Sequence, residues 1–284
     1  MSNYIMNPYD NMLKNILDNG QYRDNRTGMP TLSIFGVQSR FNIRDRFPIL
    51  TARKMYPKSV FAELLWIISG STNNNDLERF GCKFWRPWVD NAFEKKHGYK
   101  SGDFGPIYGY QLRNFGGDYY KLRDPNGFDQ LKYVIDEIKS NPLSRRILIN
   151  LWNPKDLDIQ RLPCCHYSFQ IYIYEDTISG MLTQRSADVP IGSPANIQFY
   201  SALLYMIGQQ TGYTPLELIY SIGDAHIYTN QIERVKEYLC KTKNCPDSPI
   251  MKLNKAKDIY SYNMEDFIIE DYYPLETIKI PVMV

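Results

Sequence analysis

The chain has 284 residues, 43% of them hydrophobic and 23% charged, and a formal net charge of +2. These values are ordinary for a globular protein, and a charge so close to zero gives no support for a nucleic-acid or membrane partner. The five cysteines are odd in number and irregularly spaced, the first ten residues lack the pattern of a signal peptide, and no apolar stretch is long enough to cross a bilayer. We therefore expect a cytoplasmic protein.

The first half of the chain predicts one strand, two helices and a long irregular segment between the helices. Residues 31–43 mostly alternate between apolar and polar side chains, which favours a strand. Residues 59–70 have helical apolar spacing that stops at Gly70, and residues 128–142 form an amphipathic pattern that ends at Pro142. The segment 71–127 is loop-rich and aromatic, and a segment of that length without regular structure is more often functional than idle.

The second half predicts a hairpin and a central helix. Residues 146–152 are apolar and short, as in a strand, and YSFQIYIYED and TISGMLTQRSADV indicate paired strands around an acidic turn at Glu175 and Asp176. Residues 199–212 are apolar almost all round, which indicates a central helix, and the final ETIKIPVMV is expected to be extended. Because strands and helices mix without strict alternation and no repeat or linker occurs, we expect one α+β domain over residues 1–284.

The stretch LPCCHYSFQ, residues 162–170, holds two adjacent cysteines and one of only three histidines. Adjacent cysteines cannot readily close a tetrahedral zinc site, and no CxxC spacing supplies further ligands, so no metal is expected. Side chains alternate at the start of a strand, so Cys164 and Cys165 should point to opposite sides. Arg185 on the partner strand can favour a thiolate. The residues alone leave two interpretations open, core packing and a nucleophile.

Further motifs occur in order along the chain and sharpen this choice. They are NRTG (25–28), AELLW (62–66), FGPIYGYQ (104–111), SRR (144–146), the cysteine pair with its histidine, QRSADVPIGSPANIQFY (184–200), GDAHIYTNQIE (223–233) and the tail IKIPVMV (278–284). Together they resemble the thymidylate synthase family from about residue 12 to residue 284. The family methylates C5 of dUMP with 5,10-methylenetetrahydrofolate, and close relatives hydroxymethylate C5 instead. The resemblance implies a mixed sheet that packs against its partner in a homodimer, with helices covering the other side, and a folate site within 71–127.

The resemblance also implies a covalent mechanism centred on Cys165. Its thiolate would add to C6 of the uracil, which turns C5 into an enolate carbon, while Arg185 would favour the thiolate and bind phosphate. Glu63, a carboxylate within an apolar helix, would organise proton transfer around O4. The implied catalytic residues are Cys165, Glu63, Arg185, Tyr108, His166 and Asp188.

The implied dUMP site contains arginines for the phosphate, an amide for the pyrimidine and a pair of residues for the sugar. Asn196 can donate to O4 and accept from N3–H, whereas relatives that act on cytosine nucleotides tend to carry aspartate there. The dUMP-binding residues are Arg26, Arg145, Arg146, Gln184, Ser186, Asn196, His226 and Tyr228. Arg145 and Arg146 would reach into the partner's site, which implies an obligate homodimer.

The implied folate site has an aromatic wall, Trp85 and Trp88, and an acceptor for the pterin N–H groups, Asp188. Arg53 would meet the glutamate tail of the folate, and the carboxylate of Val284 would close over the bound cofactor. The folate-binding residues are thus Arg53, Trp85, Trp88, Asp188, Gly192 and Val284. No nucleic acid, membrane or metal is required.

Three positions depart from the family pattern. Cys164 and Ala195 stand where the family usually has proline and phenylalanine, and Leu112 stands where tryptophan normally follows YGxQ. Loss of the phenylalanine removes a large apolar contact with the folate and leaves space for water, which favours hydroxymethylation over hydride transfer. The retained Trp85, Asp188 and tail guard the hydride step, so methylation is expected. Hydroxymethylation is the alternative, and an inactive nucleotide- or RNA-binding relative is a third.

Overall fold

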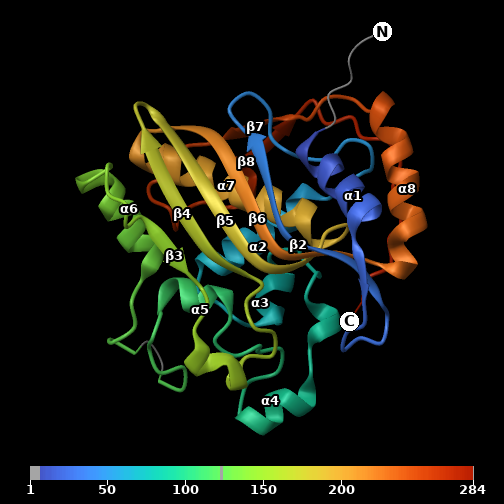
Figure 1. Cartoon of the computed structure of the whole chain (residues 1–284). Helices are drawn as coiled ribbons and strands as arrows, with labels where there is room; N and C mark the ends of the chain where they lie inside the picture. Colours follow the sequence, from blue (N-terminus) through green and yellow to red (C-terminus); the bar gives the residue numbers. More distant parts are fainter. Residues whose placement is uncertain (1–6, 122–123, 284) are drawn as a thin grey trace.

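The computed structural model describes residues 7–121 and 124–283. Its centre is a six-stranded sheet in the order β1-β2-β6-β5-β4-β3 (Figure 1). The strands are β1 (Gln21–Arg23), β2 (Thr31–Asn42), β3 (Leu148–Asn150), β4 (His166–Tyr174), β5 (Thr177–Asp188) and β6 (Thr214–Tyr228). Neighbouring strands are antiparallel except β5 and β6, which are parallel. The expected α+β class with a mixed sheet is confirmed.

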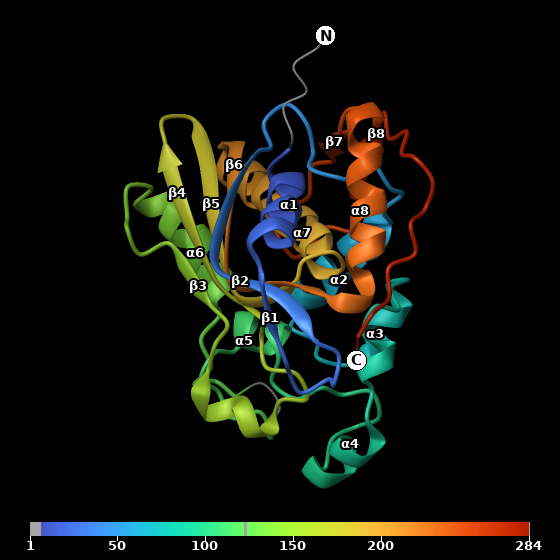
Figure 2. The same ribbon diagram turned by 45° about the vertical axis from the view of Figure 1, so that its right-hand side comes forward.

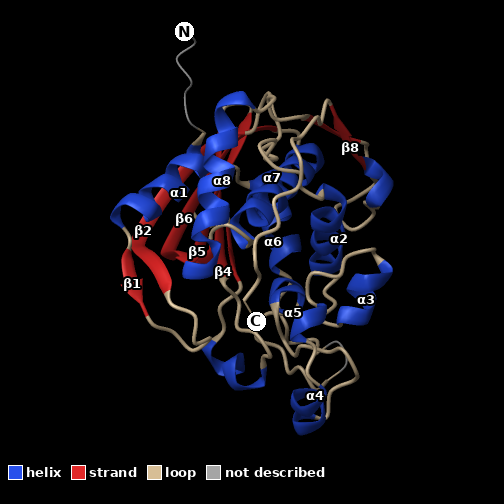
Figure 3. Cartoon of the chain, turned by 90° about the vertical axis from the view of Figure 1, so that its right-hand side faces the viewer, coloured by secondary structure: helices blue, strands red, loops and turns tan. Residues whose placement is uncertain are grey.

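The helices pack beside this sheet and leave its other face open in the views (Figures 2 and 3). They are α1 (Pro8–Asn19), α2 (Pro57–Ile68), α3 (Asn74–Arg79), α4 (Asn91–His97), α5 (Tyr108–Arg113), α6 (Gln130–Ser140), α7 (Gly192–Thr211) and α8 (Ile232–Lys241). Short 3-10 turns cover Arg86–Trp88, Pro154–Ile159, Thr229–Gln231, Thr242–Asn244 and Met264–Asp266, and β7 (Ile250–Leu253) pairs with β8 (Phe267–Glu270) in a second sheet.

Helix α7 is the crossover that makes the parallel pairing of β5 and β6 possible. It spans 20 residues, most of them buried, and packs on both strands and on α2. At Gly180 in β5 a Cβ atom would lie 2.5 Å from the ring of Phe169 and 3.1 Å from Leu204, so the missing side chain lets α7 and β4 approach closely. The predicted central helix is confirmed, and it begins seven residues earlier than the apolar pattern indicated.

The β4–β5 hairpin forms as the alternating pattern predicts. Its turn lies at Glu175 and Asp176, where Glu175 takes a φ of 51°. Residues Phe169, Ile171 and Ile173 point into the core, whereas Tyr172 and Tyr174 are exposed on the open face. The hairpin therefore fixes which side of each strand faces the helices.

Residues 71–127 are loop-rich, as predicted, but they do contain regular structure. Short helices α3, α4 and α5 and one 3-10 turn lie within this segment, joined by loops. Each helix is six or seven residues long, too short to give a clear apolar period.

Among the described residues, no helix is long and apolar enough to cross a membrane.

Candidate active site

Cys165 stands immediately before β4, with its side chain partly exposed, whereas Cys164 is fully buried. The two cysteines therefore face opposite sides, as predicted. Burial raises the pKa of the Cys164 thiol, which makes that residue an inert part of the core. The Cys165 backbone N–H donates to the phenol oxygen of Tyr108 at 2.7 Å, which anchors the backbone under the exposed sulfur.

Arg185 on β5 reaches back across the hairpin to the Cys165 sulfur. Its Nη2 lies 3.4 Å from Sγ and also donates to the carbonyl of Pro163 at 2.9 Å, while Nε donates to the carbonyl of Cys164 at 3.0 Å. The guanidinium lies 5.5 Å from the ring centroid of Trp152. These contacts hold a cation beside a partly exposed thiol, the arrangement expected of an activated nucleophile.

His166 lies behind the nucleophile between two tyrosines. Its ring stacks on Tyr108 with centroids 4.1 Å apart, and Nδ1 is hydrogen-bonded to the Tyr200 hydroxyl at 2.7 Å. Burial lowers the pKa of His166 to about 3, so the ring is neutral at physiological pH. Sequence analysis missed Tyr200, although a tyrosine inside an otherwise apolar helix signals a polar contact at its hydroxyl.

Glu63 on α2 is joined to this site through Trp85, which contacts both Glu63 and Tyr108. Burial raises the pKa of Glu63 to about 7, and the indole N–H of Trp85, donated to Oε1, partly offsets this rise. A carboxyl with such a pKa exchanges its proton near neutral pH, as a general acid or base requires. Trp85 also packs edge-on against Tyr108, 5.6 Å between centroids, and Trp88 packs against Trp85 at 6.4 Å.

The first turn of α7 places the Asn196 amide against Gln184 on β5. Asn196 Nδ2 donates to Oε1 of Gln184 at 2.9 Å, and the same oxygen accepts from the Tyr220 hydroxyl at 2.7 Å. Gln184 Nε2 in turn donates to the carbonyl of Ser186 at 2.8 Å. The orientation of Gln184 is therefore fixed, and the remaining polar atoms of Asn196 are left for a ligand. Gly192 is the first residue of this helix. If it were replaced by a residue with a Cβ atom, that atom would have only the Asn196 amide within 4 Å.

At the end of β5, Asp188 has one carboxylate oxygen in use and one without a partner. Oδ2 accepts from Gln231 Nε2 at 3.0 Å, and the buried Oδ1 has no hydrogen-bond partner. Gln231 also donates to the carbonyl of Pro281 at 2.8 Å, which joins the C-terminal tail to the site. Burial raises the pKa of Asp188 to about 6. An orphaned acceptor of this kind fits a ligand that carries N–H groups.

Arg53 is buried, at 7% relative exposure, with Nη2 donating to the carbonyl of Pro190 and Nε without a partner. The guanidinium therefore lies inside the protein, against the carbonyl of Pro190. The predicted contact with the glutamate tail of a folate needs a side chain that reaches the surface. The charge of Arg53 also acts on Asp188 and opposes the rise of that carboxyl's pKa.

His226 and Tyr228 lie together at the end of β6, with ring centroids 5.4 Å apart. His226 Nδ1 contacts Asp224 Oδ1 at 3.2 Å. Asp224 was missed by sequence analysis, although its spacing of two from His226 on a strand signals a shared face.

Three of the predicted phosphate-binding arginines, Arg26, Arg145 and Arg146, make no side-chain contact with Cys165 in the described part of the chain. Arg26 is exposed in the loop after β1, where its charge partly opposes the rise in the Tyr228 pKa that burial causes. Arg145 and Arg146 are exposed between α6 and β3. Val284 lies outside the described residues.

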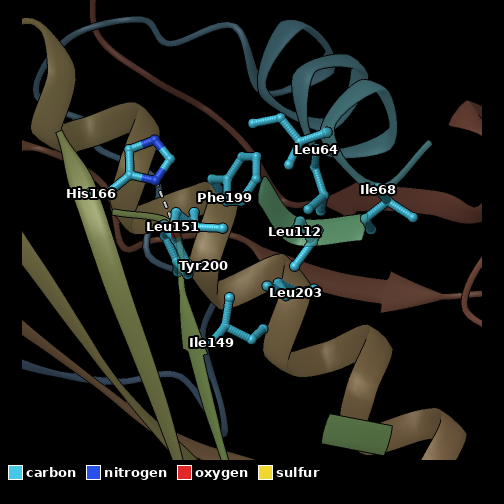
Figure 4. A pocket seen from close by; sticks show the side chains of 10 residues that line it. Leu64, Ile68, Leu112, Ile149, Leu151, His166, Phe199, Tyr200 and Leu203 are labelled. Carbon is cyan, nitrogen blue, oxygen red and sulfur yellow. Dashed lines mark hydrogen bonds between the residues drawn. The ribbon is translucent and has the colours of Figure 1, made fainter. Parts of the chain in front are cut away.

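Of the three unusual positions, Cys164 and Leu112 are buried and Ala195 is partly buried. Leu112 is 4% exposed and borders a cavity of about 20 Å³ between α2, α5, α7 and the edge of the sheet (Figure 4). His166 and Tyr200 stand at its edge, and the remaining lining side chains are apolar, including Leu64 and Phe199. Ala195 lies partly buried in the first turn of α7.

No group of three or more His, Cys, Asp or Glu residues that could hold a metal occurs within residues 7–121 and 124–283.

Comparison with known proteins matches the family model for thymidylate synthase to residues 7–284. The chain is 42% identical over 282 residues to a thymidylate synthase of Homo sapiens, covering 97% of this chain and 90% of the relative. It is 40% identical over 282 residues to a thymidylate synthase of Human herpesvirus 8 type P (isolate GK18), covering 97% and 83% respectively.

Proposed function

The chain belongs to the thymidylate synthase family of methyltransferases, which use 5,10-methylenetetrahydrofolate and no metal, and on that premise we propose that it converts dUMP to dTMP. The observation that carries this proposal is the partly exposed Cys165 sulfur, which lies 3.4 Å from the Arg185 guanidinium. Tyr108 and Trp85 connect it to Glu63, a carboxyl with a pKa of about 7. These are the parts that addition to a uracil ring needs.

We propose that the reaction begins with Cys165. Its thiolate forms a bond to C6, and the electron pair of the C5–C6 double bond moves towards C4 and O4, which makes C5 nucleophilic. The Asn196 amide can donate to O4 and so stabilise the charge that develops there. Glu63, with a pKa near neutrality, then gives or takes protons around O4, and the neutral His166 and Tyr108 hold the wall of the pocket in place.

We propose that the folate binds beside Asp188, and when bound it would supply the one-carbon unit and the hydride. Asp188 Oδ1, buried and without a partner, is suited to accept an N–H of the pterin. Trp85, Trp88 and the α7 start at Gly192 would form the surrounding wall. Arg53 is the proposed contact for the glutamate end, although its buried guanidinium would have to turn outward to meet it.

The phosphate is the proposed ligand of Arg26, Arg185 and Ser186, with His226 and Tyr228 on the sugar and Gln184 holding Asn196. We propose that Arg145 and Arg146 complete the phosphate site of the partner subunit. Both are exposed and extend from the β3 edge of the sheet. The open face carries exposed Phe35, Tyr172 and Tyr174, as a face that packs against a second copy would.

Mixing two inactive variants tests the shared site. Cys165→Ala lacks the nucleophile, and the Arg145→Ala/Arg146→Ala double variant lacks the arginines. After co-refolding, random pairing makes half of the dimers mixed, each with one intact site, so about a quarter of wild-type activity should return. Each variant refolded alone is the control. No recovery in the mixture, with mixed dimers verified by mass, contradicts the shared site.

A second activity, hydroxymethylation of dUMP, is favoured by one observation. Ala195 stands one residue before Asn196 in the first turn of α7, where its methyl group covers less of the folate side than an aromatic ring would. Mass spectrometry of the nucleotide formed from dUMP decides between the two activities. A gain of CH₂ supports the synthase, and a gain of CH₂O supports the hydroxymethylase.

A covalent complex with 5-fluoro-dUMP and methylenetetrahydrofolate tests whether the chain is an active enzyme at all. Wild type and Cys164→Ala should form the complex, because the Cys164 sulfur is buried, and Cys165→Ala should not. A wild-type protein that forms no complex supports the third hypothesis, an inactive binding protein.

A cytoplasmic location is part of the proposal, and the five free cysteines are in keeping with it. So is a single domain over residues 1–284 with a folate-site segment at about 71–127, since the family match runs through that segment without a break.

A further inference from the structure

A polar network built from three strands contacts Nδ1 of the His226 ring. Ser33 on β2 donates its hydroxyl to Oδ1 of Asp224 at 2.7 Å, and Arg23 on β1 donates to Oδ2 at 3.2 Å. The same Oδ1 lies 3.2 Å from His226 Nδ1, and the backbone carbonyl of Asp224 lies 3.3 Å from that nitrogen. Ser33 and His226 are direct cross-strand partners, so the register of β2 and β6 builds this network.

The contacts of His226 settle where its ring carries hydrogen. Both oxygens near Nδ1, a carboxylate and a carbonyl, are acceptors only. Nδ1 must therefore carry the hydrogen, and in the neutral ring Nε2 presents a lone pair. The His226 hydrogen bond is the largest of the effects that hold the pKa of Asp224 below its ordinary value, so this carboxyl is an anion at neutral pH.

We propose that Asp224, held by Ser33 and Arg23, is a positioning residue that fixes His226 as a hydrogen-bond acceptor and so selects a sugar whose 3′-hydroxyl donates. The inference rests on the proposed function, in which His226 and Tyr228 hold the 3′-hydroxyl of dUMP. Because His226 Nε2 accepts, the 3′-hydroxyl gives its hydrogen to that nitrogen, and its oxygen remains free to accept from the Tyr228 phenol. A 3′-substituent of the same size that cannot donate leaves Nε2 without a partner.

The matched probe is 2′,3′-dideoxy-3′-fluoro-UMP, which replaces the hydroxyl by a fluorine of similar size that has no hydrogen to donate. Calorimetric titration of the dimeric protein gives the affinity for dUMP and for the fluoro analogue, and their ratio is the measured quantity. Wild type should prefer dUMP by on the order of 10-fold, the value of one hydrogen bond that would be left unmade.

Asp224→Ala should weaken dUMP binding and leave the affinity for the fluoro analogue almost unchanged, so the preference falls towards 1. Asp224→Asn keeps an oxygen that can accept from Nδ1–H and should retain most of the preference. The control is Glu217→Ala, which removes a cross-strand ion pair with Arg40 from the other end of the same two strands. It should leave the preference as in wild type.

Three outcomes separate the hypotheses. A wild-type protein that does not bind dUMP overturns the proposed function. If Asp224→Ala keeps the wild-type preference for dUMP, only the positioning role is overturned. The positioning role is also overturned if Asp224→Asn loses the preference as Asp224→Ala does, because that result points to the ion pair with Arg23 and not to the hydrogen bond with His226. If Asp224→Ala does not fold, Ser33→Ala takes its place, with a smaller fall in the preference expected and an unchanged preference contradicting the role.

Discussion

The phenol oxygen of Tyr108 accepts the backbone N–H of Cys165 at 2.7 Å, although 57 residues separate the two in the chain. The Tyr108 ring also stacks on His166, the residue after the nucleophile. Helix α5 therefore holds the backbone of the nucleophile through a single side chain. Burial raises the pKa of Tyr108, so its hydroxyl keeps a hydrogen that can point into the pocket.

Tyr108→Phe should lower the free energy of unfolding by about 1–3 kcal/mol, because it leaves the Cys165 N–H without an acceptor while the ring stays in place. Denaturant titration measures the change. Tyr273→Phe, at a side chain that is 70% exposed, is the control and should change it little. An equal loss in the two variants would contradict the role given to the hydrogen bond.

Glu63→Gln should make the protein more stable above neutral pH. The pKa of Glu63 is raised from 4.5 to about 7 in the folded protein, so between these values the folded state binds more protons than the unfolded state, and stability falls as pH rises. Removing the carboxyl should therefore gain on the order of 3 kcal/mol at pH 8, less at pH 6 and little at pH 4. Unfolding curves across pH measure this difference.

Glu78→Gln provides the control of opposite sign. The Arg86 hydrogen bond lowers the pKa of Glu78 to about 2, so its carboxylate contributes stability above pH 4.5 that is lost as pH falls. That variant should be less stable than wild type at pH 8 and equal to it at very low pH. A Glu63→Gln gain that does not change with pH would show that the carboxyl is not desolvated as described.

Leu112→Trp should destabilise the fold by about 1–3 kcal/mol, because the cavity beside Leu112 holds about 20 Å³ and an indole needs far more. Leu112→Ala should cost about 3–5 kcal/mol by enlarging the same cavity. Leu143→Trp, at an 83% exposed position, is the control for added bulk. Thermal and denaturant unfolding measure all three, and a Leu112→Trp variant as stable as wild type would mean that the surrounding helices adjust freely.

Asn196→Asp should weaken dUMP binding by roughly 10- to 100-fold. The substitution removes the donor to O4 and places a carboxylate against Gln184 Oε1, which already accepts from Tyr220. Binding of dCMP should increase in the same variant, since a carboxylate can accept from a cytosine amino group. Competition binding of the two nucleotides gives both values. A variant that keeps the wild-type preference for dUMP would contradict the role of Asn196 at the pyrimidine edge.

Local patterns in the sequence determined much of the fold near the nucleophile. Alternation along 167–188 predicted the hairpin, and the hairpin by itself places Arg185 across from Cys165 and turns Cys164 inward. These features are local, because two strands joined by a tight turn have one register that buries Phe169 and Ile171. The central helix and the amphipathic pattern of 128–142 were likewise visible, since their periods span several turns.

Long-range features were decided only by the tertiary structure. The parallel pairing of β5 with β6 depends on where α7 returns the chain, and no pattern within β6 specifies its partner. The bonds from Tyr200 to His166, from Gln231 to Asp188 and from Ser33 to Asp224 join residues 34, 43 and 191 positions apart. The sequence showed that Glu63 lies in an apolar helix, but its pKa depends on how completely the neighbouring elements exclude water, and that is a property of packing alone.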